Sequence, residues 1–98
     1  MSRRPKAKVR ILLSGFSSRI GSETLNVRIY RDREAFVCER ELVERDGTSF
    51  TMVLPFREPE EVRSMLEADP HYPRVRGEVA RVLGTLDRVV REHGKRAA

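Results

Sequence analysis

Three segments of the chain alternate between apolar and polar side chains, which is the pattern of strands with one covered face. They span residues 24–31, 34–44 and 48–56. Their apolar positions are Leu25, Val27 and Ile29, then Phe36, Cys38 and Leu42, then Phe50, Met52, Leu54 and Phe56. Val9, Ile11 and Leu13 alternate in the same way, so we expect a further strand over residues 8–13.

The register of the first hairpin follows from its turn at residues 31–33. A two-residue loop at Asp32 and Arg33 places Ile29 opposite Phe36, and it brings the apolar positions of both strands to one face. A slip of one residue would move every side chain to the wrong face. We therefore predict an antiparallel hairpin with this pairing.

The second hairpin turns at residues 45–47, where Asp46 precedes Gly47. A two-residue loop would set apolar residues of one strand against glutamates of the other. A three-residue loop instead pairs Leu42 with Phe50 and lets Gly47 take the left-handed backbone conformation. We predict the three-residue loop.

After Phe56 the apolar period changes to that of helices. Pro59 with acids beside it begins a first helix, and Asp69-Pro70 ends it. A second helix runs from near Pro73 to about His93, with Gly94 as its C-terminal cap. Its apolar positions are Val75, Val79, Val82, Leu83, Leu86, Val89 and Val90.

The predicted fold class is therefore α+β: an antiparallel β-meander of about four strands followed by two helices, in a two-layer sandwich. We expect a flexible basic arm at residues 1–7, one domain at 8–94 and a C-terminal tail at 95–98. The longest aliphatic run is three residues, far below the ~20 that a membrane helix needs. We expect no membrane association.

Few residues suggest catalysis or metal binding. Cys38 is the only cysteine and occupies an inward strand position, so we expect a buried, unreactive thiol. The two histidines lack partners at metal-ligand spacing. Glu39 and Glu41 share the outer sheet face, and Ser14–Ser18 is predicted to be a loop. We therefore expect a protein that is not an enzyme and has no cofactor and no metal.

Arg40 is the one charged residue that the alternation directs to the apolar face. A lone charge there is costly unless it is paired. One interpretation places its stem at the margin of the sheet with its head in water, or pairs it with Glu78 or Asp87. The other interpretation makes it a buried ligand for an anion.

The net charge of +5 is located entirely in the first ten residues, because residues 11–98 hold fifteen basic and fifteen acidic side chains. The basic residues of this stretch are Arg3, Arg4, Lys6, Lys8 and Arg10. An acid-free, Arg-rich and Ser-rich start is also typical of organelle transit peptides, but the strand-like alternation that follows favours a strand over a helical targeting segment. Because a single cysteine cannot form an internal disulfide, we expect a cytoplasmic protein.

The second helix carries basic residues at every seventh position, namely Arg74, Arg81, Arg88 and Lys95. With Arg91, Gly77 and Gly84 they fall within about a quarter of the helix circumference, opposite the apolar stripe. One interpretation is a rail for phosphates. The other is a solvated face neutralised by acids four residues away, in the pairs Arg74–Glu78, Asp87–Arg91 and Arg88–Glu92.

Two functions remain open. The first is nucleic-acid binding, to DNA or RNA, through the basic arm and the arginines of the last helix, with little sequence discrimination. The layout is similar to that of small meander-plus-helix modules that bind single strands, although the sequence has no matching motif. The second is a protein-interaction or homo-oligomeric module, such as a homodimer, with no nucleic-acid role.

Overall fold

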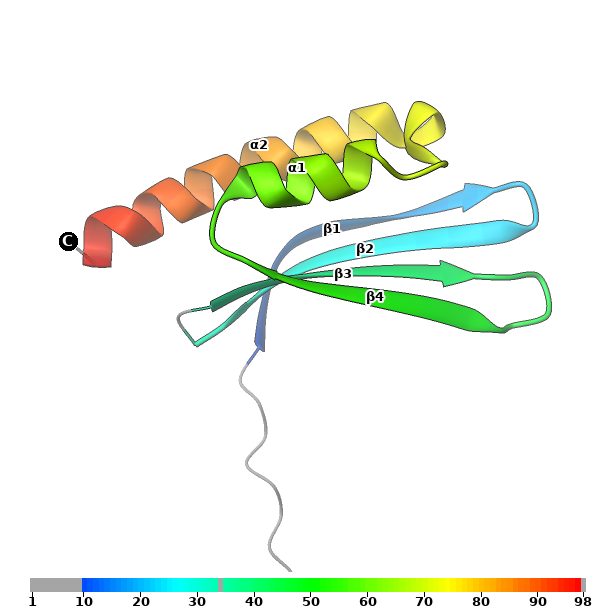
Figure 1. Ribbon diagram of the computed structural model, residues 1–98, viewed down its shortest axis with the longest axis horizontal. Coiled ribbons are helices and arrows are strands. Elements are labelled where there is room, and N and C mark those ends of the chain that lie inside the picture. Colours follow the sequence, from blue (N-terminus) through cyan, green and yellow to red (C-terminus); the bar gives the residue numbers. More distant parts are fainter. Residues whose placement is uncertain (1–9, 34, 98) are drawn as a thin grey trace, which may run out of the picture.

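The computed structural model describes residues 10–33 and 35–97, with side chains of the last helix described as far as Glu92. Four strands, β1 (Arg10–Ile20), β2 (Glu23–Asp32), β3 (Ala35–Val43) and β4 (Ser49–Phe56), precede two helices, α1 (Pro59–Glu67) and α2 (Tyr72–Ala97). The strands form one antiparallel sheet in the order β1-β2-β3-β4 (Figure 1). The predicted α+β meander followed by two helices is confirmed.

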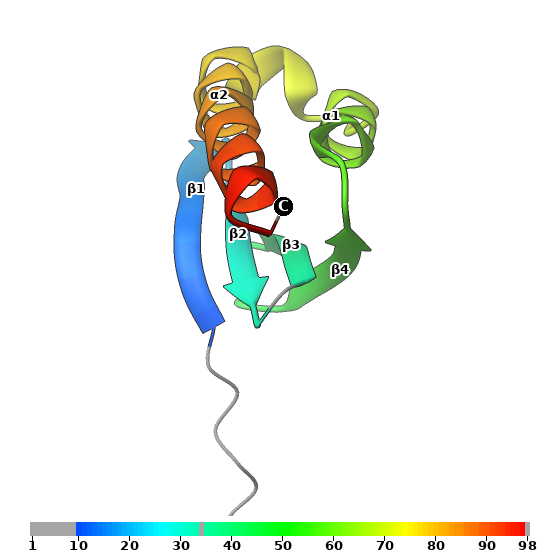
Figure 2. The ribbon, with the colours of Figure 1, turned by 90° about the vertical axis from the view of Figure 1, so that its left-hand side faces the viewer.

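Both helices lie on one face of the sheet and make the second layer (Figure 2). α2 packs over β1, whereas α1 packs against α2 and reaches β4. The core between the layers is formed by the inward side chains of the strands and one stripe of each helix. Its fully enclosed members include Leu25, Val27, Ile29, Cys38, Val62, Val75, Val79, Val82 and Leu86.

β1 is longer than predicted, because Ser14–Ser18 belongs to the strand and is not a loop. The strand has an irregular register between Leu12 and Ser14, where one extra residue is accommodated. Gly15 follows this bulge and lies so close to β2 that a Cβ on it would stand 2.4 Å from the Val27 carbonyl oxygen. The glycine that suggested a loop is therefore required by close strand packing.

The first hairpin has a different register from the predicted one. Ile29 lies opposite Cys38, and Asp32, which was expected in the loop, pairs with Ala35. Arg33 adopts a left-handed conformation with φ 60°, so the chain turns one residue later than expected. Because the shift amounts to two residues on the partner strand, every side chain stays on its predicted face.

The second hairpin confirms the predicted three-residue loop. Leu42 pairs with Phe50, and Gly47 has φ 89°. The backbone N–H of Glu44 donates to the Thr48 carbonyl oxygen at 2.7 Å, which closes the loop. The Asp46 carboxylate accepts the Thr48 backbone N–H at 2.9 Å, and hydrogen bonding with the Thr48 side chain, followed by this backbone bond, lowers the pKa of Asp46.

Both helices begin close to the predicted residues, but α2 ends later than predicted. α1 starts with a capping box between Glu58 and Glu61 and closes at Ala68. α2 does not stop at Gly94 and continues to Ala97. Its backbone is irregular at Val75, with φ −126° and ψ 21°, so its first turn is set apart from the long regular part.

Candidate nucleic-acid interface

The outer side of α2 presents the predicted arginines to solvent. We define the arginine face of α2 as Arg74, Arg81, Arg88 and Arg91, all of which are exposed. The opposite side of the helix holds the buried stripe that covers the sheet. Arg74 belongs to the first turn, before the irregularity at Val75, and the other three lie on the regular helix. The side chain of Lys95 lies outside the described residues.

The intrahelical ion pairs of the second interpretation, in which nearby acids neutralise the basic face, are not formed among the described side chains. Among the described side chains, no carboxylate lies within 4.0 Å of a guanidinium of the arginine face. Glu78 and Asp87 are half-buried on the same helix, and Glu92 is exposed. The positive charge of this face is therefore not cancelled by direct contacts within the described part of the chain.

Arg81 connects the arginine face to the edge of the sheet. Its Nη2 donates to the carbonyl oxygen of Gly15 at 3.0 Å, across 66 residues of sequence. A guanidinium has five N–H donors, so this one bond leaves donors for a further acceptor. Arg81 is consequently held in place at the β1 edge while remaining exposed.

Gly77 and Gly84 leave the surface between the arginines open. Both are exposed, and a Cβ built on either would find nothing within 4 Å. Without side chains at these positions, a phosphate chain can approach the helix backbone closely. On the regular part of α2, Arg81, Arg88 and Arg91 are thus exposed together with two glycines.

Arg10, one of the five basic residues among the first ten positions, is engaged by acids of the protein itself. Its Nη1 lies 3.0 Å from Glu39 Oε2, and its Nε lies 3.6 Å from Asp32 Oδ2. Its guanidinium also stands 5.6 Å from the ring centroid of Tyr30. Arg3, Arg4, Lys6 and Lys8 lie outside the described residues, so the predicted role of the arm stays a prediction.

The outer sheet face carries the two glutamates where the alternation predicted them. Arg28 contacts Glu39 at 3.5 Å and Glu41 at 3.3 Å, and Asn26 donates to Glu41 at 3.1 Å. Burial lowers the pKa of Arg28, but the Glu41 hydrogen bond and neighbouring charges outweigh it and raise the pKa overall. Both carboxylates are used in this network.

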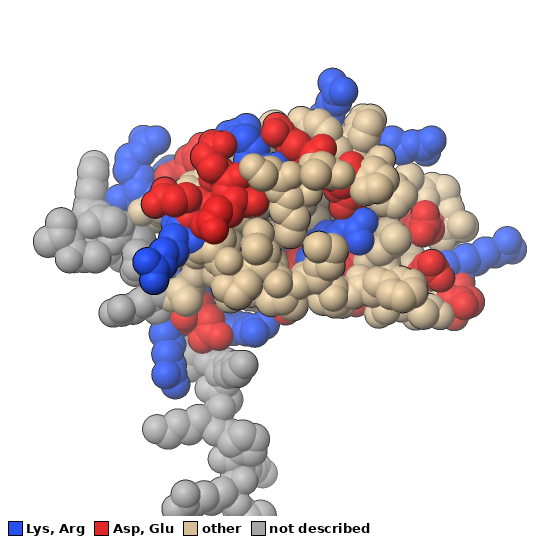
Figure 3. Space-filling view, viewed as in Figure 1, with Lys and Arg blue, Asp and Glu red and all other residues tan. Residues whose placement is uncertain are grey.

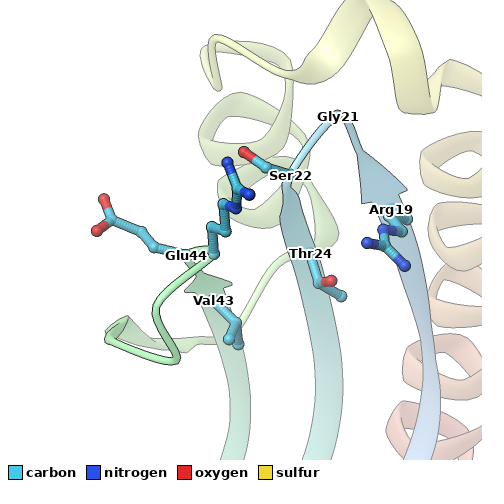
Figure 4. Close-up of a pocket in the computed structure, with 7 residues that line it drawn as sticks. Arg19, Gly21, Ser22, Thr24, Val43 and Glu44 are labelled. Atoms are coloured by element: carbon cyan, nitrogen blue, oxygen red, sulfur yellow. The ribbon is translucent and has the colours of Figure 1, made fainter.

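A second cationic surface was not foreseen from the sequence. Arg19, at the end of β1, and Arg45, in the β3–β4 turn, line one hollow together with Ser22 and Thr24 (Figure 4). In the close-up, the carboxylate of Glu44 extends away from Ser22 and Thr24. The two arginines are 26 positions apart in the sequence, so their spacing does not indicate that they share a surface. They lie together because the β1–β2 turn and the β3–β4 turn are at the same end of the sheet (Figure 1).

Acidic side chains gather away from the arginine face. Glu58, Glu60 and Glu61 surround the start of α1, where Figure 3 shows a dense group of acids. Carboxylates at a helix N-terminus are stabilised by the helix dipole. The described part of the molecule thus has an acidic side at α1 and a basic side on α2.

Arg40 has a partner that the sequence did not suggest. Its Nε lies 2.6 Å from Asp69 Oδ2, and neither Glu78 nor Asp87 is involved. Asp69 Oδ1 also accepts the backbone N–H of His71 at 2.9 Å. The carboxylate of Asp69 therefore occupies the place that an anion would take beside Arg40.

The structure describes the surroundings of Cys38 and His71. Cys38 is fully buried, and burial raises the pKa of its thiol to about 12. His71 Nε2 lies 3.8 Å from Glu23 Oε1. Within the described residues, no group of three or more potential metal ligands occurs.

Neither α1 nor α2, as far as they are described, has the length and apolarity that a membrane crossing requires. Comparison with protein-family models, with curated proteins and with solved structures found no match for the chain.

Proposed function

We propose that this chain is a small non-enzymatic binding protein of the cytoplasm that holds nucleic acid with little sequence discrimination. The observation that carries the proposal is the arginine face of α2, whose four exposed guanidiniums have no acidic partner among the described side chains. Guanidiniums match phosphate oxygens in fork geometry and are weakly hydrated, so they suit phosphate contacts.

The spacing of the face supports a contact with a polyanion. Arg81 and Arg88 are seven residues apart, which corresponds to about 10 Å along a helix, and Gly84 lies between them. Successive phosphates of one strand are closer together than this, so arginines one repeat apart can bind phosphates of the same strand that are not adjacent. Such contacts read no base edges, so the affinity depends on salt and little on sequence.

The sheet is a weaker candidate for the binding surface. On its outer face, Arg28 is tied to Glu39 and Glu41, and Arg10 is tied to Glu39 and Asp32. Sheet surfaces that bind single strands also need aromatic rings on which bases stack. The outer face of the described strands offers Tyr30, and Arg10 lies over that ring. The binding surface is therefore better sought on α2.

The test is a titration of labelled duplex DNA, single-stranded DNA and RNA at several salt concentrations with the full chain. A triple variant, Arg74→Gln, Arg88→Gln and Arg91→Gln, removes three charges without touching the Arg81 bond to Gly15. If all three contact phosphates, the salt slope on duplex DNA falls by about 2.7, at roughly 0.9 per contact. A chain lacking residues 2–8 measures the contribution of the arm in the same way.

Arg57→Gln is the matched control, because Arg57 is exposed near the acidic start of α1 and away from α2's outer side. It changes the net charge but should leave the salt slope unchanged. Equal losses in Arg57→Gln and Arg88→Gln would indicate a diffuse charge effect instead of a defined face. No binding of any probe at low salt would overturn the proposal.

The second candidate function is a protein-interaction or homo-oligomeric module. It is favoured by one specific observation, the large apolar side chains that β4 leaves exposed. This function and nucleic-acid binding use different surfaces, so separate measurements distinguish them.

A further inference from the structure

β4 is an edge strand whose inner face is only partly covered. Phe50 and Met52 point to the same side as the core, yet they are 57% and 54% exposed. At the other end of the strand, Phe56 is 5% exposed and stacks on Phe36 with ring centroids 5.7 Å apart. The helices thus cover one end of β4 and leave the other open.

The hydrogen bonds of the β3–β4 turn show which backbone groups of β4 are free. Glu44 donates to Thr48, so even-numbered residues of β4 face β3 in the ladder and odd-numbered residues face outward. Pro55, which has no N–H, occupies one of the outward positions, as proline in an edge strand must. Ser49, Thr51 and Val53 consequently direct their N–H and carbonyl groups away from β3.

The two edges of the sheet differ in their protection. β1 carries Arg10 and Arg19, has a bulge between Leu12 and Ser14, and has its Gly15 carbonyl bonded by Arg81. Charges, bulges and covering side chains are the means by which proteins block edge strands. β4 has no charged residue over its whole length, Ser49–Phe56. Figure 3 shows that the surface over this strand is almost free of charged side chains.

We infer that two copies of the chain associate by antiparallel pairing of β4 with β4 of the second copy. A two-fold axis beside Thr51 pairs Ser49 with Val53 of the second copy, and Thr51 with its own counterpart, through the outward backbone groups. The same register places Phe50 opposite Met52 of the second copy on the inner face. A thioether against an aromatic ring is a favourable contact.

A second copy fits this edge better than a charged partner strand does. Self-pairing of an uncharged strand brings no like charges together, whereas antiparallel self-pairing of β1 about its middle would bring Arg10 of one copy towards Arg19 of the other. Pairing about Thr51 also covers two exposed apolar side chains from each copy, Phe50 and Met52. The dimer has one continuous sheet, with all helices on the same face.

The first experiment measures the mass of the full chain by sedimentation equilibrium over a wide concentration range. We expect a species of twice the 11.3 kDa monomer mass that dissociates on dilution. Amide hydrogen exchange, followed above and below the dissociation range, should show Thr51 and Val53 protected only in the dimer. A chain that stays monomeric at the highest concentration would overturn the inference.

Thr51→Pro removes an outward N–H that makes no bond to β3, so it should abolish the dimer and leave the monomer folded. Thr51→Ala is its control, because it keeps the N–H and should keep the dimer. Phe50→Glu tests the same surface through its side chain, and it gives the answer if the proline variant fails to fold. A dimer of unchanged affinity in folded Thr51→Pro or Phe50→Glu would locate the interface elsewhere and overturn the inference.

Because β4 and the arginine face lie on different edges of the molecule, Thr51→Pro and the arginine triple variant separate the two proposals. Loss of nucleic-acid binding in the triple variant, with the dimer intact, agrees with both proposals. If the chain does not dimerise, the inference about β4 is overturned, and the salt titrations still test nucleic-acid binding independently.

Discussion

Arg40 illustrates how one charged residue is accommodated on the covered face of a sheet. Its position follows from simple alternation in β3, and Met52 and Val27 are its neighbours across the two ladders. Its partner Asp69 comes 29 residues later, in the short connection between the helices. Sequence spacing pointed to acids on α2 because that helix covers the sheet. Only the path of the chain after α1 brings Asp69 to this place.

The ion pair of Arg40 with Asp69 should matter for stability, because their side chains are only 14% and 7% exposed. Asp69→Ala leaves Arg40 without its partner and should lower the free energy of unfolding by about 3 kcal/mol, near the lower end for a buried pair. Urea unfolding of the parent chain, of Asp69→Ala and of a double variant measures this loss. In the double variant Arg40→Met with Asp69→Leu, part of the stability should return.

Arg63→Ala provides the comparison, since Arg63 contacts Glu60 at 3.1 Å in an exposed pair. Its loss should cost less than about 1 kcal/mol. Equal effects of Arg63→Ala and Asp69→Ala would show that the Arg40 pair is no more important than a surface pair.

At the scale of single elements, the sequence predicted which face of the sheet each side chain occupies better than it predicted how the strands pair. The second turn contains Asp46-Gly47, and the need for a left-handed glycine selects its register. The first turn contains no glycine or asparagine, and Arg33 takes the left-handed conformation instead. Alternation alone cannot distinguish registers that differ by two, because both preserve the faces.

The amino-acid composition around Gly15 predicts the wrong structure for this part of β1. A serine- and glycine-rich stretch favours a loop, yet here the glycine permits close approach of β1 to β2. Gly15→Ala should therefore destabilise the protein by roughly 1–3 kcal/mol, the usual cost of overpacking. Gly84→Ala, in an exposed helical position with open space, should stabilise it by about 1 kcal/mol.

Thermal or urea unfolding of these two variants measures effects of opposite sign. If Gly15→Ala were as stable as the parent chain, β1 would have to move away from Val27 without cost. That result would contradict the tight strand packing described above.

The capping box of α1 makes the stability of the protein depend on pH. Glu61 Oε2 accepts the backbone N–H groups of Glu58 at 2.9 Å and Arg57 at 2.8 Å, and these bonds lower the pKa of Glu61 below its ordinary 4.5. A lowered pKa in the folded state stabilises the protein above pH 4.5 and ceases to do so as the pH falls. Glu61→Gln should therefore flatten the decrease in melting temperature below that pH.

Glu60→Gln is the control for this measurement, because Glu60 is exposed in the same turn and contacts Arg63 instead of the helix cap. Its pH profile should follow that of the parent chain. Identical profiles for Glu61→Gln and the parent chain would show that the cap does not contribute to the acid sensitivity.

At the scale of the whole molecule, the sequence predicted the layers and the exposed arginines of α2 from periodicity alone. It did not predict which charges are engaged. Arg10 belongs to the acid-free start of the sequence but is held by Asp32 and Glu39. Arg88 and Arg91, which one interpretation paired with acids of the same helix, have no acidic partner among the described side chains. Pairing depends on side-chain geometry across elements, and four-residue spacing is only one of its conditions.

The meander has a consequence for the order in which the protein forms. Each hairpin joins neighbouring segments and can close locally, but the Arg81 bond to Gly15 spans 66 residues. During synthesis the sheet is complete in sequence at Phe56, before any of α2 has been made. The apolar side of the nascent sheet must therefore wait for its cover until α2 leaves the ribosome, and this interval is when the chain is most exposed to aggregation.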